Sequence, residues 1–286
     1  MPSIDVGGVS LYYEEKGTGE PLVMVHGIPT DYRAWSAQME PFSKAYRTIA
    51  VSRRYAAPNA RMGDVMDSTI GNNAADLKGF IEELGIAPVH LVGHSYGGFA
   101  ATYFAADHPE MIRTLVLVEP AVATLLVANP KSSTQVLSLL LRSPSVALAA
   151  RRYQSGSLYP SLRALDAGQP ERAVELNVDG VQDLRGAYAK LPEETRRMML
   201  DNARTVGEQR TEFPRFTASE AGRISSRTLV LNGDSGALWL RKIGELLARA
   251  IPSAKRATVP QTRHFPHMEN PQEFNQKVLA FLSEGK

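Results

Sequence analysis

Residues 89–99 read VHLVGHSYGGF, and the rest of the chain is best interpreted outward from this stretch. It joins an apolar run typical of a buried strand to an Ala-rich helical pattern through Gly-x-Ser-x-Gly, with Ser95 at the centre. The five-residue pattern alone arises by chance in roughly one chain in ten of this length, but its position between strand and helix is far rarer. We therefore interpret Ser95 as a nucleophile on a strand-to-helix turn. The alternative is a glycine-rich turn with a bystander serine.

The glycines of this turn have a physical reason. A serine in a strained turn needs neighbours without side chains, and Gly93 and Gly97 provide that clearance. The amide of Tyr96 would then lie at a helix N-terminus, where developing negative charge is stabilised. A second amide should come from the turn after the apolar run at 21–25, and we expect it to be that of Ile28.

Apolar runs alternate with helical patterns along most of the chain, which indicates an α/β fold with a mostly parallel sheet and crossover helices. The predicted strands are Val9–Glu15, Pro21–Gly27, Tyr46–Val51, Val89–Val92, Thr114–Val118, Thr228–Leu231 and Arg256–Val259. The predicted helices are Asn73–Leu84, Gly97–Asp107, Leu238–Ala250 and Glu273–Leu282. A turn at 17–19 predicts a hairpin at the sheet edge.

The alternation breaks between Pro120 and Arg227, where no convincing strand occurs. Helical patterns cover 136–153, 171–177 and 193–210, with prolines between them. This predicts a helical cap of residues 120–227 inserted into a core domain of residues 1–119 and 228–286.

Composition excludes several classes of protein. The 286 residues are 43% apolar and 22% charged, as in ordinary globular chains. A net charge of +2 without a basic block argues against nucleic acid as a partner. The absence of cysteine excludes disulfides, zinc thiolates and a cysteine nucleophile. Neither a leader-like start nor an apolar run of about 18 residues occurs, so we expect a cytoplasmic protein with no membrane partner. Oligomeric state is not readable.

Taken together, these features resemble the α/β-hydrolase superfamily over nearly the whole chain. The matching parts are the turn at His26-Gly27, the elbow from Gly93 to Gly97, the cap-sized insertion and His264 in the loop after the last predicted strand. The elbow is the most specific of them. The resemblance implies a serine, histidine and acid triad, with no metal or organic cofactor.

The resemblance points to His264 as the base, because the superfamily keeps its base in that loop. From there the imidazole can take the proton of Ser95 and later return it to the leaving group. His267 competes for the role, but we expect it to pack or cap a helix. We expect His26 to hold its own loop and His94 to point away from the nucleophile.

The acid has two candidates. The superfamily usually carries it a few residues after the penultimate strand, near Asp234, but the common Gly-x-x-Asp spacing counted from Gly233 lands on Gly236. Some dehalogenases and lactone hydrolases of the superfamily carry it at the end of the strand before the cap. Glu119 holds that position here, and a carboxylate that closes an apolar strand is costly unless paired. We favour Glu119, with Asp234 as the alternative.

Two groups of residues are candidates for the substrate pocket, since ligand sites are mostly apolar with few polar anchors. Asp31 and Trp35 follow the turn that carries Ile28. An apolar ceiling could come from the cap, although simple packing is the alternative for its members, Tyr153, Tyr159, Tyr188 and Met198. We expect Arg54 to be a structural arginine rather than a clamp for a substrate carboxylate.

The function that these residues favour is hydrolysis of a carboxylic ester, a lactone or an activated carbon–carbon bond. The substrate would be small and largely apolar, and the reaction would pass through an acyl-enzyme. A cofactor-free perhydrolase or haloperoxidase would use the same triad. A ligand receptor that retains the triad without turnover is the alternative outside enzymes.

Overall fold

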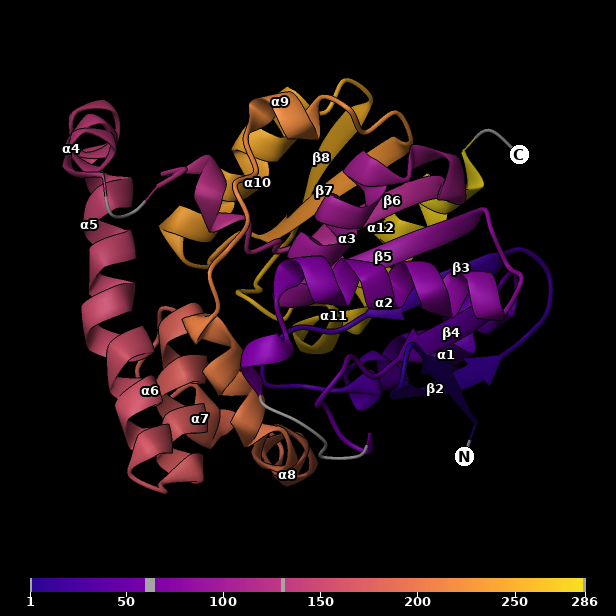
Figure 1. Cartoon of the computed structure of the whole chain (residues 1–286), viewed down its shortest axis with the longest axis horizontal. Helices are drawn as coiled ribbons and strands as arrows, with labels where there is room; N and C mark the ends of the chain where they lie inside the picture. The colour runs from indigo at the N-terminus through magenta and orange to yellow at the C-terminus, as the bar shows by residue number, and fades with distance from the viewer. Residues whose placement is uncertain (1, 60–64, 130–131, 285–286) are drawn as a thin grey trace.

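The structure is a computed structural model that describes residues 2–59, 65–129 and 132–284, and within them lies one eight-stranded sheet (Figure 1). Its strand order is β1-β2-β4-β3-β5-β6-β7-β8. The strands are β1 Ser3–Val6, β2 Val9–Lys16, β3 Pro21–Val25, β4 Arg47–Val51, β5 Val89–His94, β6 Ile112–Val118, β7 Arg227–Gly233 and β8 Ala254–Val259. β1 with β2 and β2 with β4 are antiparallel, and the remaining pairs are parallel.

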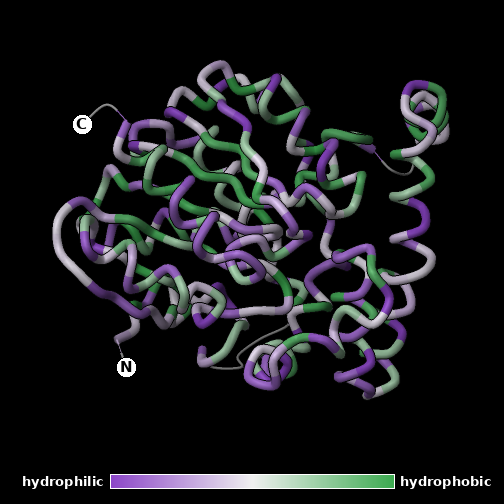
Figure 2. Tube along the Cα trace, turned by 180° about the vertical axis from the view of Figure 1, so that it is seen from behind, coloured by the Kyte–Doolittle hydropathy of each residue, from purple (hydrophilic) through white to green (hydrophobic). Residues whose placement is uncertain are grey.

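Helices cover both faces of the sheet. One face packs on α2 Ile70–Glu83, α3 Ser95–Asp107 and α10 Leu238–Ala250, and the other on α1 Ser36–Ser43 and α12 Pro271–Ser283. Strands covered on both faces must be apolar on both, which explains the continuous apolar runs of β3, β5 and β6. Figure 2 shows that hydrophobic stretches run along the central strands, whereas hydrophobic and hydrophilic residues alternate along the outer helices. The predicted α/β fold is confirmed.

The chain between β6 and β7, here called the β6–β7 insertion, holds no strand in its described residues 119–129 and 132–226. In Figure 1 most of it forms a long rod and a group of helices on one side of the sheet, whereas its last helix lies beside α10. Its helices are η4 Ala123–Leu125, α4 Ser133–Arg142, α5 Pro144–Tyr153, the π-helical η5 Gln154–Leu158, α6 Tyr159–Asp166, α7 Pro170–Val181, η6 Tyr188–Lys190, α8 Glu193–Asp201, η7 Ala203–Arg210 and α9 Ala218–Ala221. The assignment of residues 120–227 as a separate cap domain remains a prediction.

Two helices predicted in this segment are each divided. The pattern at 136–153 becomes α4 and α5 because Pro144 lacks an amide hydrogen and excludes helical geometry from Ser143. The pattern at 193–210 becomes α8 and the 3-10 helix η7, with Asn202 between them.

The predicted edge hairpin is wrong in its position. The hairpin joins β1 to β2 through Gly7 and Gly8, which have φ of 58° and 87°. The turn at 17–19 leads instead from β2 to β3, and these strands are not neighbours because β4 lies between them.

The shorter helices complete the chain: η1 Tyr32–Trp35, η2 Val65–Asp67, η3 Pro109–Met111 and α11 Pro266–Glu269. Among the described residues, no helix combines the length and the apolar character that crossing a bilayer requires. Because β3 to β8 are parallel neighbours, their carboxyl ends meet at one edge of the sheet. Open α/β sheets bind their ligands at such an edge.

Candidate active site

Ser95 begins α3 directly after β5, with φ of 52°, a left-handed conformation that is rare for a residue with a side chain. A Cβ on Gly97 would lie 2.3 Å from the carbonyl oxygen of His26, and one on Gly93 would lie 2.8 Å from the Cβ of Ala101. Both positions therefore require glycine. Ser95 is only 7% exposed and lies under other parts of the chain.

His264 reaches Ser95 from the loop after β8. Its Nε2 lies 3.0 Å from Ser95 Oγ, which is hydrogen-bond distance, and the histidine is buried. Two partners outside the loop hold its backbone. The His264 amide donates to Gln182 Oε1 at 3.0 Å, and His94 Nε2 donates to the His264 carbonyl oxygen at 2.8 Å. The structure thus brings together the two residues that the sequence identified as nucleophile and base.

Glu119 lies on the other side of the His264 ring. It follows β6 with φ of 46°, is fully buried, and presents Oε2 at 3.6 Å from His264 Nδ1. Its Oε1 accepts from the side-chain amide of Asn232 at 3.0 Å and from the Gly233 amide at 2.8 Å. Within the described residues neither Glu119 Oε2 nor His264 Nδ1 has a hydrogen-bond partner, and the two atoms face each other as a buried ion pair would.

Asp234 has a different position. Its exposed carboxylate accepts from the Gln261 amide at 3.0 Å and from Ser235 Oγ at 2.8 Å. The Gln261 hydrogen bond, followed by that from Ser235, lowers the pKa of this carboxyl. Asp234 therefore closes the turn that precedes His264 rather than approaching its ring.

Asn232 is a site residue that the sequence analysis missed. It is the penultimate residue of β7, is fully buried, and fixes Glu119 through the hydrogen bond described above. The available signal was a polar residue at the end of an apolar strand, the same signal that identified Glu119. The pattern predicted an acid, whereas the hydrogen-bond donors that a buried carboxylate also requires have no sequence pattern of their own.

The turn after β3 approaches the nucleophile closely. A Cβ on Gly27 would lie 2.7 Å from the Cβ of Ser95, so this turn passes beside the elbow. The Gly27 carbonyl oxygen lies 2.8 Å from His26 Nδ1 and accepts from Thr30 Oγ1 at 3.1 Å. Ile28 is buried within the turn, and Tyr96 is the second residue of α3, where amides have no intrahelical acceptor.

Burial favours the neutral form of three other histidines, His26, His94 and His267. Burial, and then the charge of Arg53, lower the pKa of His26 well below its ordinary value. Burial also lowers the pKa of His94 well below its ordinary value and that of His267 to about 3. The His94 ring packs at a tilt between those of His264 and His267, with ring centroids 4.9 and 4.6 Å away. These residues position and pack, as expected for His26 and His267.

Asp31 and Trp35 are both buried and have structural contacts. Asp31 caps η1, pairs with Arg33 at 2.6 Å and accepts from Asn202 Nδ2 at 2.7 Å. Trp35 is fully buried and packs on His267 at 4.4 Å. Their place in the substrate pocket remains a prediction.

Tyr159 and Tyr153, both predicted for the apolar ceiling over the pocket, differ in exposure and in contacts. Tyr159 is 52% exposed at the start of α6, and its place in the apolar ceiling remains a prediction. Tyr153 stacks on Trp239 at 4.9 Å and lines a cavity of about 490 Å³ between the β6–β7 insertion and the start of α10.

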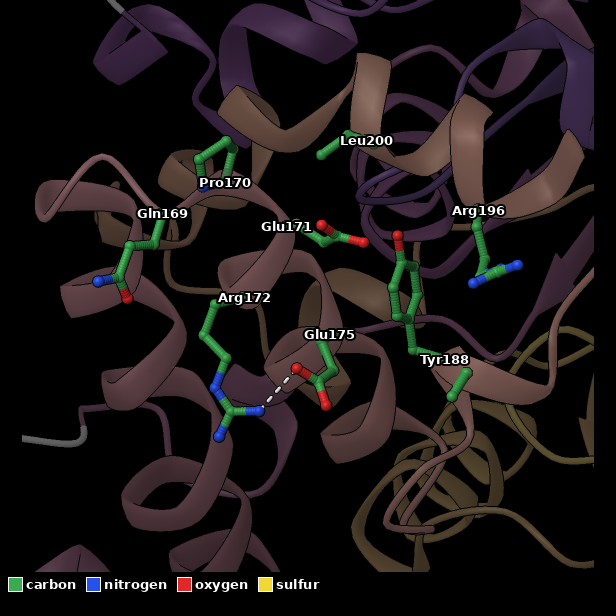
Figure 3. Close-up of a pocket in the computed structure, with 9 residues that line it drawn as sticks. Gln169, Pro170, Glu171, Arg172, Glu175, Tyr188, Arg196 and Leu200 are labelled. Carbon is green, nitrogen blue, oxygen red and sulfur yellow. Dashed lines mark hydrogen bonds and ion pairs between the residues drawn. The ribbon is translucent and has the colours of Figure 1, made fainter. Parts of the chain in front are cut away.

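Tyr188 and Met198 are both buried in the main apolar cluster, which is the packing role given as the alternative. Tyr188 also lines a cavity of about 660 Å³ on α7, η6 and α8, where its hydroxyl faces the carboxylate of Glu171 (Figure 3). Ser95 and His264 do not line either of these cavities.

The two arginines after β4 have different surroundings. Arg54 donates through Nε and Nη2 to both carboxylate oxygens of Asp76 on α2, each at 2.6 Å, as expected for a structural arginine. Arg53, which the sequence analysis did not single out, is buried and contacts the turn after β3.

Comparison with known proteins gives a consistent result. The family model described as alpha/beta hydrolase fold matches residues 20–271. A 2-hydroxy-6-oxononadienedioate/2-hydroxy-6-oxononatrienedioate hydrolase from Comamonas testosteroni is 29% identical over 96% of this chain and 92% of its own. A 2-hydroxy-6-oxo-6-phenylhexa-2,4-dienoate hydrolase from the same organism is 27% identical, over 98% and 93%.

Solved structures share the fold. A malate-bound esterase from Thermogutta terrifontis superposes with a TM-score of 0.69 at 24% identity, over 98% of this chain and 96% of that one. The enol-lactonase from Burkholderia xenovorans gives 0.64 at 20% identity, over 99% and 100%.

Proposed function

The chain belongs to the α/β-hydrolase fold family, and from this premise we propose that it is a serine hydrolase whose triad is Ser95, His264 and Glu119. The observation that carries the proposal is the 3.0 Å distance between Ser95 Oγ and His264 Nε2, with the buried Glu119 carboxylate on the opposite side of the imidazole. Nucleophile, acid and base follow one another along the chain in the order typical of this family.

In the first step His264 acts as the general base. Nε2 takes the proton of Ser95 as Oγ attacks the carbonyl carbon of the substrate, and a tetrahedral intermediate forms. The imidazolium then returns that proton to the leaving group. The bond to the leaving group breaks, and the acyl group remains on Ser95.

Glu119 has the role of the orienting acid. Its Oε2 stabilises the imidazolium that forms on His264 and selects the tautomer with the hydrogen on Nδ1. The distance of 3.6 Å is longer than a hydrogen bond, and contacts of this kind commonly tighten when substrate binds. Asn232 and Gly233 occupy Oε1, which leaves Oε2 for the histidine.

The negative charge of the intermediate needs two donors beside Ser95. The amides of Ile28 and Tyr96 are the candidates, because the turn after β3 approaches Ser95 from one side and the N-terminus of α3 from the other. Fixed backbone donors aimed at a developing oxyanion are usually a large part of catalysis. In the second step His264 activates a water, which releases the acyl group.

For the substrate we propose a small, largely apolar molecule with an ester, a lactone or an activated carbon–carbon bond. The hydrolases of 2-hydroxy-6-oxo acids that resemble this chain along nearly their whole length support the carbon–carbon class. We propose that the β6–β7 insertion acts as the cap, since its Gln182 accepts from the His264 amide and Ser95 is 7% exposed.

The test combines labelling with turnover. A fluorophosphonate probe should label the wild-type protein on Ser95. A panel of p-nitrophenyl esters, lactones and 2-hydroxy-6-oxo-dienoates should reveal turnover that Ser95→Ala abolishes. Ser155→Ala, which alters an exposed serine on η5, is the matched control and should change neither measurement. Unchanged turnover in Ser95→Ala would overturn the proposal. Ligand binding without turnover would favour a receptor, and peroxide-dependent halogenation would favour a perhydrolase.

A further inference from the structure

Arg53 contacts the turn after β3 through both its backbone and its side chain. Its amide donates to His26 Nε2 at 2.9 Å, and its Nε donates to the His26 carbonyl oxygen at 3.0 Å. This turn passes beside Ser95 at Gly27 and carries the Ile28 amide. Arg53 therefore holds one of the two proposed oxyanion donors through the residue that precedes Gly27.

The same guanidinium also contacts the second proposed donor. Its central carbon lies 4.9 Å from the centre of the Tyr96 ring, the geometry of a cation–π interaction. Arg53 thus touches both residues that flank the nucleophile from opposite sides, the turn through His26 and the elbow through Tyr96.

The β6–β7 insertion holds the guanidinium in this place. Nη1 donates to Glu208 Oε2 on η7 at 2.8 Å, and also to Asn73 Oδ1 on α2 at 3.0 Å. The side chains of Arg53 and Glu208 are 2% and 0% exposed, so this is a buried ion pair between the insertion and the core. Burial raises the pKa of Glu208 while Arg53 opposes the rise.

Stability alone does not explain a buried ion pair, since apolar residues of similar size often stabilise a fold as well or better. Its fixed geometry is a better reason for its presence, because a planar guanidinium can bind several acceptors in set directions. Here those acceptors join the insertion to the turn and the elbow.

We propose that Arg53 is a positioning residue for the oxyanion turn and that Glu208 completes the site by holding Arg53 from the β6–β7 insertion. This inference rests on the proposed function. It assigns the insertion a part in setting catalytic geometry in addition to covering the substrate.

The experiment separates positioning from simple stability. Arg53→Met, Glu208→Met and the charge-free double variant Arg53→Met/Glu208→Met are compared in kcat, KM, thermal midpoint and affinity for a trifluoromethyl ketone, whose adduct carries an oxyanion. Arg53→Lys retains the charge, but one ammonium group cannot donate to His26 and Glu208 at the same time. It therefore tests the same contacts if a methionine variant does not fold. Asp201→Asn is the matched control, because Asp201 forms an exposed ion pair between α8 and Arg33 of η1 at 2.9 Å.

We expect each single variant to lose kcat by about 10- to 100-fold, with KM changed by less than about 3-fold, and to lose affinity for the ketone in parallel. The double variant should regain the thermal midpoint but not kcat. Asp201→Asn should retain both. Recovery of kcat together with the midpoint in the double variant overturns the inference, and so does a change confined to KM. If the wild-type protein shows no turnover dependent on Ser95, the proposed function fails, and this inference fails with it.

Discussion

Ser95 and Glu119 occupy equivalent positions on neighbouring parallel strands, each following one member of the register pair His94 and Val118. Both have a left-handed φ, 52° for Ser95 and 46° for Glu119, and the Ala121 amide donates to the Ser95 carbonyl oxygen at 3.0 Å. The proposed nucleophile and acid are therefore fixed relative to each other by the sheet itself. His264 enters between them from a loop.

The acid assignment is tested by replacing each candidate with its amide. Glu119→Gln should lower kcat by about 10²- to 10⁴-fold, because an amide cannot stabilise the imidazolium and can favour the wrong tautomer. Asp234→Asn should remain within about 3-fold of wild type, since its carboxylate faces Gln261 and Ser235. Steady-state kinetics with one ester decide between them. The reverse ranking would make Asp234 the acid.

Asn232 should matter for activity beyond its effect on stability. Asn232→Ala leaves Glu119 Oε1 with the Gly233 amide alone, and we expect about 1–3 kcal/mol lower free energy of unfolding and about 10-fold lower kcat. Asn275→Ala is the control, because that buried asparagine bonds Gln38 and Ala37 away from the triad. It should lose similar stability with kcat retained. Equal kcat losses in the two variants would show that Asn232 only supports the fold.

The buried histidines make the fold sensitive to acid. His267 has a folded pKa of about 3 against an ordinary value of 6.5, so the unfolded chain binds more protons between these values. The contribution of neutral His267 to the free energy of unfolding is then fully present above pH 6.5, and it is lost as the pH falls toward 3. For His267 alone the loss between pH 7.5 and 5 is about 2 kcal/mol.

His267→Phe should reduce that dependence, because phenylalanine fills the space beside Trp35 and Phe274 and does not titrate. The measurement is the free energy of unfolding in urea at pH 7.5 and 5. His26 and His94 contribute in the same direction, so part of the pH dependence of the free energy of unfolding should remain in the variant. An identical slope in wild type and variant would contradict the assignment of a neutral buried His267.

Gly97 should tolerate no side chain. The Cβ of Gly97→Ala would meet the His26 carbonyl oxygen at 2.3 Å and the Val25 carbonyl oxygen at 2.8 Å, and we expect about 3 kcal/mol of destabilisation with loss of turnover. Gly71→Ala is the control on α2, where the nearest atom is 3.9 Å away. That change should stabilise the protein by about 0.5–1 kcal/mol. Thermal unfolding and Ser95 labelling of the two variants provide the comparison.

The sequence was most informative where one local rule determines the structure. Gly93 and Gly97 identify the elbow because backbone contacts on both sides exclude a Cβ. Glu119 could be identified because a charge that ends an apolar run needs a partner. The break in α4 and α5 at Pro144 was equally readable, and it was missed only because helical periodicity continues across it.

The residues of the pocket could not be predicted in the same way. Tyr153 and Tyr159 lie six positions apart on continuous helical structure, yet one stacks on Trp239 and the other is turned to solvent. Which face of a helix is buried depends on the packing of distant elements, and the π-helical turn of η5 changes the face between these residues. The role of Arg53 depends on Glu208, which is 155 positions away.

The position of β8 has a consequence for how activity is lost. His264 follows β8, the last strand of the sheet, which has β7 as its one neighbour, whereas β5 and β6 are each paired on both sides. Edge elements open at lower free energy than the centre of a sheet, so transient fraying of this edge would withdraw the base while nucleophile and acid stay in register. On gradual heating, inactivation should therefore begin while amide hydrogens of the central strands still resist exchange.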